Sequence, residues 1–491
     1  MQKHLARMTL REKVAQMVFI DFRFDEADYE RTVRLVKKEG VGGVCLFGGS
    51  VFDVPGLVNS LQRVAKFPLL VAADYENGAG HHVAGATVFP TNMAVGATGS
   101  EELAQLKGRH TGLEARALGV RWVLAPVVDV NSNPLNPVIN TRSFGDDPAI
   151  VAGLSRAFFK GLHSVGTLGC AKHFPGHGGV AADSHLELPG IEETPDLRPF
   201  AELAGEADAV MTGHLRVKSV DAESPASLSR AVTHGLLRGE LKFDGLVTTD
   251  ALMMGGVTKF CAEGDAVRRA AQAGADVLLY PGDPDLAIHA LEEAVKGGQL
   301  AEAAVDRAVE RILAAKDRLG LFAERLTDVA SVELTVGGMA PRAAAQRIAE
   351  AAVTLVRGSG RIGERTAFFK LQDDGAGGDL TVFETELAKR ATLSDDAGTC
   401  VIAVYFRPRA YAGKTGLEEA QVERIREAQK RYKDVVVVSF GSPYVLRQFP
   451  DVGGFVCAYG EDLFSQRAAA KALTGSIEYK GRLPVRLEAG P

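Results

Sequence analysis

The chain has 491 residues, of which 46% are hydrophobic and 24% are charged, and its formal net charge is −6. This composition is typical of a soluble globular protein of about two to four domains that bury their own cores. The mild negative charge, without a long run of one sign, argues against binding to nucleic acid or to an anionic membrane surface.

The cysteines and the first residues bear on the compartment. No two of the five cysteines are close enough for a CxxC metal or redox motif, so we expect buried free thiols in a reducing compartment. The opening segment MQKHLARMTLREKVAQMV has no apolar core or cleavage site of a signal peptide. No segment reaches the about 18 uninterrupted apolar residues of a membrane span. We therefore expect a cytoplasmic protein that does not enter a membrane.

Short apolar runs alternate with helical patterns over the first two-thirds of the chain. Such runs, often bounded by glycine, are typical of strands buried on both faces. The predicted strands are 17–21, 42–47, 68–74, 122–129, 167–172, 209–212, 245–249 and 276–280. The predicted helices include 24–38, 102–118, 148–164, 284–296 and 305–319. This alternation predicts a (β/α)8 barrel, and the alternative is a doubly wound open sheet, although no GxGxxG or GxxxxGK[ST] motif opens a helix.

The last third of the chain alternates again, after a stretch without clear periodicity. Its predicted strands are 367–371, 400–406, 434–440 and 454–459, and its predicted helices are 344–356, 417–432 and 461–474. The predicted fold class is therefore α/β. We expect a (β/α)8 TIM-type barrel over 1–325, a linker over 326–343 and a smaller α/β sandwich domain over 344–491.

Ionisable residues fall at the ends of the predicted barrel strands. Barrel enzymes carry their chemistry at the carboxyl ends of the strands, so this placement predicts an active site. Any one of these residues alone has a simpler interpretation, as a satisfied polar group in a loop. The strand-end residues are Asp74, Asp129, Lys172, His173, His214 and Asp250.

The densest polar cluster is KHFPGHG at 172–178, followed by DSH at 183–185. His173 and His177 have the spacing of a metal-binding pair on a helix. A proline and a glycine between them break a helix, however, and the neighbouring lysine repels a cation. We therefore predict neither a metal site nor a cofactor.

Two carboxylates and a histidine suit acid/base and nucleophilic chemistry. Asp183 is close enough to His185 to hold its tautomer and raise its basicity, so the pair can exchange a proton near neutral pH. The alternative is an exposed loop pair without a role. Asp250 ends an apolar strand and needs a hydrogen-bonding or cationic partner to stay ionised. Held in that way, it can attack the anomeric carbon of a sugar.

The chain resembles glycoside hydrolase family 3, in its β-N-acetylglucosaminidase (β-N-acetylhexosaminidase) branch. The resemblance runs through residues 8–322 and, less sharply, through the C-terminal region. The segments that carry it are MTLREKV at 8–14, GVGG at 40–43, APVVDVN at 125–131, NPVI at 136–139, RSFGDDP at 142–148, the two segments at 172–178 and 183–185, and TDAL at 249–252.

The resemblance implies an enzyme that removes terminal β-linked N-acetylglucosamine from short glycans or cell-wall fragments with retained configuration. It implies that Asp250 is the nucleophile and that His185 is the general acid/base, partnered by Asp183. The residues that it places on the sugar hydroxyls are Asp74, Arg142, Lys172 and His173. The expected partner is a carbohydrate that contains N-acetylglucosamine, and the expected assembly is a monomer or a homodimer. An absent signal peptide favours intracellular recycling of cell-wall peptidoglycan fragments.

Three alternatives stay open. A neutral imidazole repels phosphate less than a carboxylate does, so a β-N-acetylglucosaminide phosphorylase is one alternative. A β-glucosidase or β-xylosidase on the same fold is another, against which the DSH loop argues. The third is a sugar-binding protein without activity. The chain also departs from the family pattern, with DYENG at 74–78 where DQEGG is common and with GVAA at 179–182 where polar residues are common.

Overall fold

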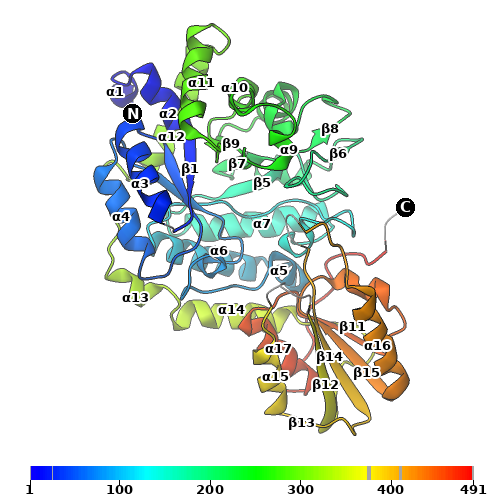
Figure 1. The fold of residues 1–491 in the computed structure, drawn as a ribbon. Helices are drawn as coiled ribbons and strands as arrows, with labels where there is room; N and C mark the ends of the chain where they lie inside the picture. The colour runs from blue at the N-terminus through cyan, green and yellow to red at the C-terminus, as the bar shows by residue number, and fades with distance from the viewer. Residues whose placement is uncertain (1, 25, 373–377, 409–411, 489–491) are drawn as a thin grey trace.

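The computed structural model describes residues 2–24, 26–372, 378–408 and 412–488, which form a barrel and a smaller sheet-containing unit (Figure 1). No helix within these ranges combines the length and the apolar character needed to cross a membrane. The five cysteines are free thiols; four are buried, whereas Cys261 is half-buried.

Parallel strands close into the predicted barrel. Regular pairing joins five strands in one sheet and three in another, and isolated bridges join the two sheets at both seams. At the seams, the Val123 amide donates to the Leu168 carbonyl at 2.8 Å and the Thr249 amide donates to the Val277 carbonyl at 3.0 Å. The barrel prediction is confirmed, because closure excludes the open sheet. In spatial order the strands are β1 (Val18–Phe22), β2 (Gly43–Leu46), β3 (Leu70–Ala73), β4 (Trp122–Val123), β5 (Cys170–Phe174), β7 (Ala209–Thr212), β9 (Leu246–Thr249) and β10 (Leu278–Leu279).

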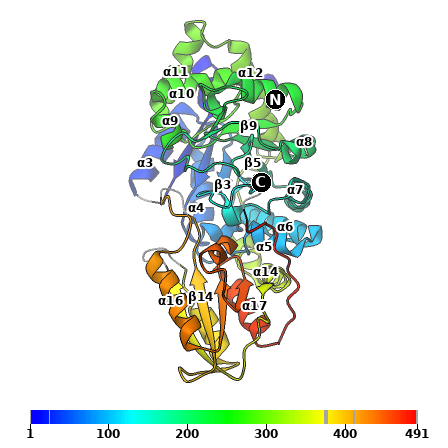
Figure 2. The same cartoon turned by 90° about the vertical axis from the view of Figure 1, so that its right-hand side faces the viewer.

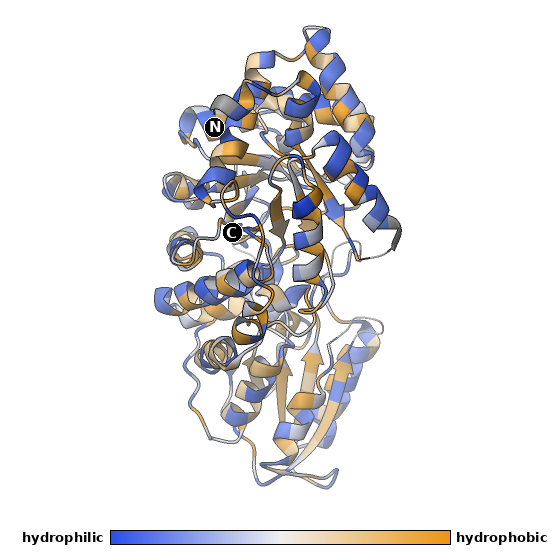
Figure 3. Ribbon diagram, turned by 90° about the vertical axis from the view of Figure 1, so that its left-hand side faces the viewer, coloured by the Kyte–Doolittle hydropathy of each residue, from blue (hydrophilic) through white to orange (hydrophobic). Residues whose placement is uncertain are grey.

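Helices surround the barrel, and their outward faces are polar where the strands are apolar (Figure 3). The α-helices are α1 (Gln2–Leu5), α2 (Leu10–Met17), α3 (Glu26–Arg34), α4 (Val54–Val64), α5 (Asn92–Thr98), α6 (Glu101–Ala117), α7 (Pro148–His163), α8 (Arg198–Leu203), α9 (Gly255–Thr258), α10 (Glu263–Ala273), α11 (Pro284–Lys296) and α12 (Glu302–Arg318). Other helical segments are η1 (Leu35–Glu39), η2 (Ala79–His81), η3 (Asn140–Arg142), η4 (Ala226–Leu228) and η5 (Ala231–Glu240), and a small pair of strands is β6 (Gly190–Ile191) with β8 (Arg216–Val217).

Local sequence explains where two of these helices begin. Thr9 and Glu12 form a capping box at the start of α2, in which each side chain accepts from the other residue's amide, at 3.3 and 2.8 Å. Asp147 caps α7 by accepting from the Ala149 amide at 2.8 Å, and Pro148 occupies the first turn. Both motifs lie in segments that carry the family resemblance, so part of that resemblance specifies the fold.

Two predicted strands differ from the structure. The strand predicted over 122–129 ends at Val123, because a proline three residues later has no backbone N–H with which to continue the ladder. The strand predicted over 167–172 is β5, which begins and ends later. Its pairing with β7 continues past Lys172, where we expected the strand to end, since Asp74 and Asp129, which follow other strands, pair with Lys172 and His173.

The C-terminal unit is a sandwich with a central sheet of order β11-β16-β15-β14-β12-β13, parallel except for β11. Alternate residues of β14 face opposite layers: Val401 and Ala403 pack toward α15 and α17, whereas Cys400 and Ile402 pack toward α16. The strands are β11 (Thr354–Arg357), β12 (Arg365–Gln372), β13 (Thr392–Leu393), β14 (Thr399–Tyr405), β15 (Asp434–Ser439) and β16 (Gly454–Cys457). The helices are α15 (Thr381–Ala388), α16 (Glu419–Arg431), α17 (Leu463–Leu473) and the short η6 (Pro443–Gln448).

The two units are joined by packed helices. The range 326–343, which we expected to be a linker, contains α13 (Ser331–Thr335) and the start of α14 (Met339–Ala352). Helix α14 lies between the barrel and the sandwich (Figure 2), and its residue Ile348 shares one apolar cluster with Leu103 of α6 and Ala468 of α17. The domain boundaries stay a prediction from the sequence.

Candidate active site

A cavity of about 230 Å³ opens at the carboxyl ends of the barrel strands. It brings together six of the seven predicted site residues, and the seventh, Asp183, contacts one of them. The polar walls are Asp74, Arg142, Lys172, His173, His185 and Asp250, and the apolar walls include Phe47, Met211, Met253, Met254 and Leu279. Residues far apart in the sequence therefore meet in one site, as the strand-end positions of Asp74, Lys172, His173 and Asp250 predict.

His185 and Asp183 form a pair on the loop that follows β5. The His185 Nδ1 lies 2.8 Å from Asp183 Oδ1, and the His185 amide donates to the same oxygen at 2.9 Å. The Asp183 side chain is buried, whereas the His185 side chain is 20% exposed. The carboxylate thus holds the proton on Nδ1 and makes Nε2 the nitrogen that can exchange a proton with a ligand in the cavity.

The loop of this pair is docked on the segment that follows Asp250. The amides of Gly255 and Gly256 donate to the carbonyls of His185 and Ser184, at 3.1 and 3.0 Å. A Cβ atom at Gly255 would lie 2.7 Å from the His185 carbonyl oxygen, so a side chain there would force the loop away. No local pattern predicts this role, because the glycines become important only through a tertiary contact.

A second contact on the same loop comes from the KHFPGHG segment. His177 Nε2 lies 2.9 Å from Ser184 Oγ, and both side chains are buried. Burial lowers the pKa of His177 to about 4, so its ring is neutral at pH 7. The histidine that we compared with a metal ligand therefore anchors the loop between the two members of the acid/base pair.

Asp250 is held as a carboxylate. Burial alone would raise its pKa, but the imidazoles of His173, His214 and His185 lower the pKa of Asp250 well below its usual range. The Ala251 amide also donates to Asp250 Oδ1 at 2.8 Å. An ionised carboxylate in a partly desolvated cavity is the state that a nucleophile requires.

His214 contacts the backbone of the residue that follows Asp250. Its Nε2 lies 2.9 Å from the Ala251 carbonyl oxygen, and its Nδ1 lies 2.7 Å from Ser227 Oγ. The ring is fully buried, and burial lowers its pKa. We noted this histidine only for its place after a strand; its contacts show that it orients the backbone beside Asp250.

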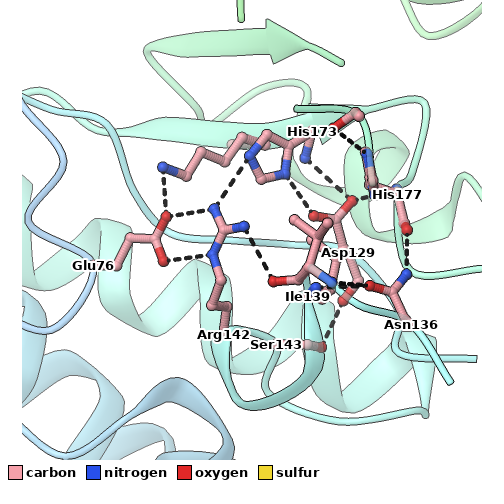
Figure 4. Close-up of polar contacts among 12 residues, drawn as sticks. Glu76, Asp129, Asn136, Ile139, Arg142, Ser143, His173 and His177 are labelled. Atoms are coloured by element: carbon pink, nitrogen blue, oxygen red, sulfur yellow. Dashed lines mark hydrogen bonds and ion pairs between the residues drawn. The ribbon is translucent and has the colours of Figure 1, made fainter. Parts of the chain in front are cut away.

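A charged network lines the cavity, and Figure 4 shows how its members Glu76, Arg142 and His173 lie. Lys172 Nζ lies 2.6 Å from Asp74 Oδ1 and 2.7 Å from Glu76 Oε1. Arg142 donates two hydrogen bonds to the Glu76 carboxylate, of 3.0 and 2.8 Å. Burial would lower the pKa of Lys172, but Asp74 and Glu76 raise it well above its usual value. The wall thus presents fixed charged donors and acceptors, which suit the hydroxyls of a sugar ring.

His173 joins this network to a buried aspartate. Its Nδ1 lies 2.7 Å from Asp129 Oδ2, and its Nε2 lies 3.4 Å from Arg142 Nη2. Asp129 also accepts from the His177 amide at 2.6 Å. Burial would raise the pKa of Asp129, but the two histidines hold it below its usual range.

Glu76 and Asp129 belong to the site, although neither was among the predicted site residues. The position of Asp129 at a predicted strand end was a signal for it. Glu76 lies two residues after Asp74, a spacing that can place both side chains on one side of an extended segment. Within the described ranges, no group of His, Cys, Asp and Glu side chains is arranged to hold a metal ion.

Comparison with known proteins agrees with this architecture. The family model described as glycosyl hydrolase family 3 N terminal domain matches residues 9–315, and the chain therefore belongs to glycosyl hydrolase family 3. A β-N-acetylglucosaminidase/β-glucosidase of Cellulomonas fimi is 29% identical over 98% of this chain and 94% of its own. The β-hexosaminidase LpqI of Mycobacterium tuberculosis is 35% identical over 63% of this chain and 84% of its own.

Two solved structures are similar over nearly the whole chain. A β-N-acetylglucosaminidase of family 3 from Paenibacillus sp. has a TM-score of 0.88 and 31% identity, with 99% of this chain and 100% of that chain covered. The β-glucoside phosphorylase BglX has a TM-score of 0.92 and 25% identity, with 100% of this chain and 96% of that chain covered. Relatives of this fold thus include both a glycosidase and a phosphorylase.

Proposed function

We propose that this protein is a retaining β-N-acetylglucosaminidase that removes terminal β-linked N-acetylglucosamine from short glycans, cell-wall fragments included. The observation that carries the proposal is the Asp183–His185 pair, whose loop is docked on the segment that follows Asp250. The names of the Cellulomonas, Mycobacterium and Paenibacillus relatives support the substrate class. A cytoplasmic location and a role in recycling peptidoglycan stay predictions from the sequence.

The proposed reaction has two steps. In the first, Asp250 attacks the anomeric carbon while His185 protonates the departing glycosidic oxygen, which leaves a covalent glycosyl-enzyme. In the second, His185 takes a proton from water, and the resulting nucleophile releases the sugar with retained configuration. Asp183 stabilises the protonated ring. Asp74, Arg142, Lys172 and His173 hold the sugar hydroxyls.

A panel of p-nitrophenyl glycosides tests the proposal. We expect turnover of the β-N-acetylglucosaminide well above that of the β-glucoside and β-xyloside, and losses of about 10²–10⁴-fold in Asp250→Asn and His185→Ala. Matched controls are Asp451→Asn and His289→Ala, at exposed positions outside the site, which should retain full activity. Unchanged activity in Asp250→Asn would rule out Asp250 as the nucleophile. A preference for the glucoside or the xyloside would mean that the protein is a β-glucosidase or a β-xylosidase instead.

Phosphorolysis is the second candidate. The acid/base is an imidazole, which repels an incoming phosphate less than a carboxylate would, and BglX is a phosphorylase of similar fold. Addition of inorganic phosphate distinguishes the two. Hydrolysis predicts an unchanged rate and free N-acetylglucosamine, whereas phosphorolysis predicts a faster rate and a sugar 1-phosphate as the product.

A further inference from the structure

A second cavity lies at the amino-terminal ends of strands β9 and β10, between η5, α12 and the chain that leads into β9. Its volume is about 410 Å³. Asp250 follows the carboxyl end of β9, so this cavity is at the opposite face of the barrel from the active site. The four residues of β9 alone separate the two by roughly 13 Å.

The lining of this cavity is strongly basic. Asp244 and Asp276 are its only carboxylates among the described residues, in a chain whose net charge is −6. They are outnumbered by five cationic side chains, Arg230, Arg238, Lys242, Arg307 and Arg311. We call these five side chains the basic cluster.

Two members of the basic cluster are held rigidly. Asp276 lies 2.6 Å from Arg238 Nη2 and 3.2 Å from Arg311 Nη1, and its side chain is buried. Arg238 also donates to the carbonyls of Phe243 and Gly245, at 2.9 and 2.6 Å. Arg311 Nη2 also lies 3.1 Å from Asp244 Oδ1. The two aspartates thus hold two guanidinium groups in place, and the excess positive charge of the cavity comes from the other three members of the basic cluster.

The other three members are exposed and have few partners. Arg230 donates to the Gln272 carbonyl at 3.3 Å, whereas Lys242 and Arg307 make no hydrogen bond or ion pair within the part of the chain that the structure describes. These side chains come from separate segments and line the same cavity. Their charges are available to a ligand.

The positive charge of the basic cluster affects the pKa of a histidine that lines the same cavity. His234 lines the cavity and is exposed to solvent. Burial lowers its pKa somewhat, and the charges of Arg230, Arg238 and Arg307 lower it further. Cations from two helical segments therefore act at one point in space, where an anion would be attracted.

We propose that this cavity binds a small anion that bears phosphate groups. Guanidinium groups match phosphate oxygens with paired hydrogen bonds, and the volume is in the range of small-molecule sites. The phosphate can belong to a sugar phosphate or to a nucleotide, because both present the same group to the basic cluster. The inference is independent of the reaction that the barrel catalyses at its other face.

Calorimetric titration of the full chain with pyrophosphate tests the site. We expect saturable binding, weakened at least tenfold in the double variant Arg230→Ser/Arg307→Ser. The matched control is Lys37→Ser/Arg63→Ser, which removes the same charge from exposed positions elsewhere and should bind as the parent does. Glycosidase activity of both double variants shows that they fold. Further titrations with glucosamine 6-phosphate and with adenosine diphosphate distinguish the two sources of phosphate.

The His234 resonance locates the bound ion. Pyrophosphate at the basic cluster should shift the imidazole signals of His234 in an NMR spectrum and raise its pKa, because the added negative charge opposes the arginines. Equal binding by the Arg230→Ser/Arg307→Ser variant, an unperturbed His234, or equal affinity for sulfate at matched ionic strength would each overturn the proposal.

Discussion

Neighbouring side chains keep Asp250 ionised and orient the ring of His185. Burial disfavours a charged Asp250, and the surrounding histidines reverse that effect. Asp183 Oδ1 lies 2.8 Å from His185 Nδ1 and holds the imidazole ring in place. Asp250 is thus kept ionised, whereas a carboxylate orients the ring of His185.

Replacement of Asp183 tests its share of the acid catalysis. In Asp183→Asn, the imidazole loses the carboxylate that holds its ring and its Nδ1 proton in place. We expect turnover of a disaccharide, which has a poor leaving group, to fall by about 10²–10³-fold. An aryl glycoside with a good leaving group should lose much less, because it needs little protonation. Equal losses for both substrates would show that Asp183 acts through loop structure instead.

Lys316 provides a test of the interior of the barrel. It is fully buried, its Nζ donates to Gln16 Oε1 at 2.7 Å, and burial lowers its pKa to about 7. The unfolded chain therefore binds one more proton than the folded chain between about pH 7 and the ordinary lysine value. The free energy of unfolding should rise with pH there, by up to about 1.4 kcal/mol per unit from this group.

In Lys316→Met this contribution disappears. Urea unfolding at pH 7, 8 and 9 should show a smaller rise of stability with pH than in the parent, by roughly 2 kcal/mol across the range. Groups common to both proteins cancel in the comparison. The same pH dependence in both would mean that Lys316 is charged in the folded chain.

At the scale of elements, the strands could be predicted and several contacts could not. Apolar runs mark β7 and β9 nearly to the residue, because burial on both faces leaves a local signal. The polar strand ends also predicted four of the residues that line the cavity, Asp74, Lys172, His173 and Asp250. Glu76, His177 and Gly255 could not be found in this way, since their roles depend on partners that lie elsewhere in the sequence.

The docking of the acid/base loop on α9 leads to a prediction. In Gly255→Ala, the new Cβ would meet the carbonyl oxygens of His185 and Leu186, at 2.7 Å each. We expect kcat to fall at least tenfold while the chain stays folded, because His185 moves relative to Asp250. Gly264→Ala is the control, since its Cβ would meet only Ala290 Cβ at an ordinary 3.5 Å. Full activity in Gly255→Ala would show that the loop works without this contact.

At the scale of the whole molecule, the sandwich contacts the loop that carries Arg142. The Asn131 side chain donates to the Tyr444 hydroxyl at 3.0 Å, and the Asn140 side chain donates to Ser442 Oγ at 3.1 Å. Asn140 is two residues before Arg142. The C-terminal unit therefore supports the segment that places Arg142 in the cavity. Whether the chain is a monomer or a homodimer stays a prediction.

Loss of the two asparagine hydrogen bonds to the sandwich should lower stability and weaken substrate binding. In the double variant Ser442→Ala/Tyr444→Phe, both asparagine side chains lose an acceptor, at a cost of about 1–3 kcal/mol in stability. We also expect a higher KM, because the Arg142 loop becomes less ordered. Tyr432→Phe, in the same unit but away from the barrel contact, is the control. Unchanged KM and unfolding midpoint would mean that the sandwich does not support the site.

The covalent intermediate is the centre of the account, and a slow substrate can trap it. A 5-fluoro-β-N-acetylglucosaminyl fluoride combines a good leaving group with a fluorine that slows both steps, so that the glycosyl-enzyme accumulates. Mass spectrometry of the digested protein should then find one sugar on the peptide that contains Asp250, and none in Asp250→Asn. A labelled peptide without Asp250, or unlabelled protein that still turns over substrate, would contradict the account.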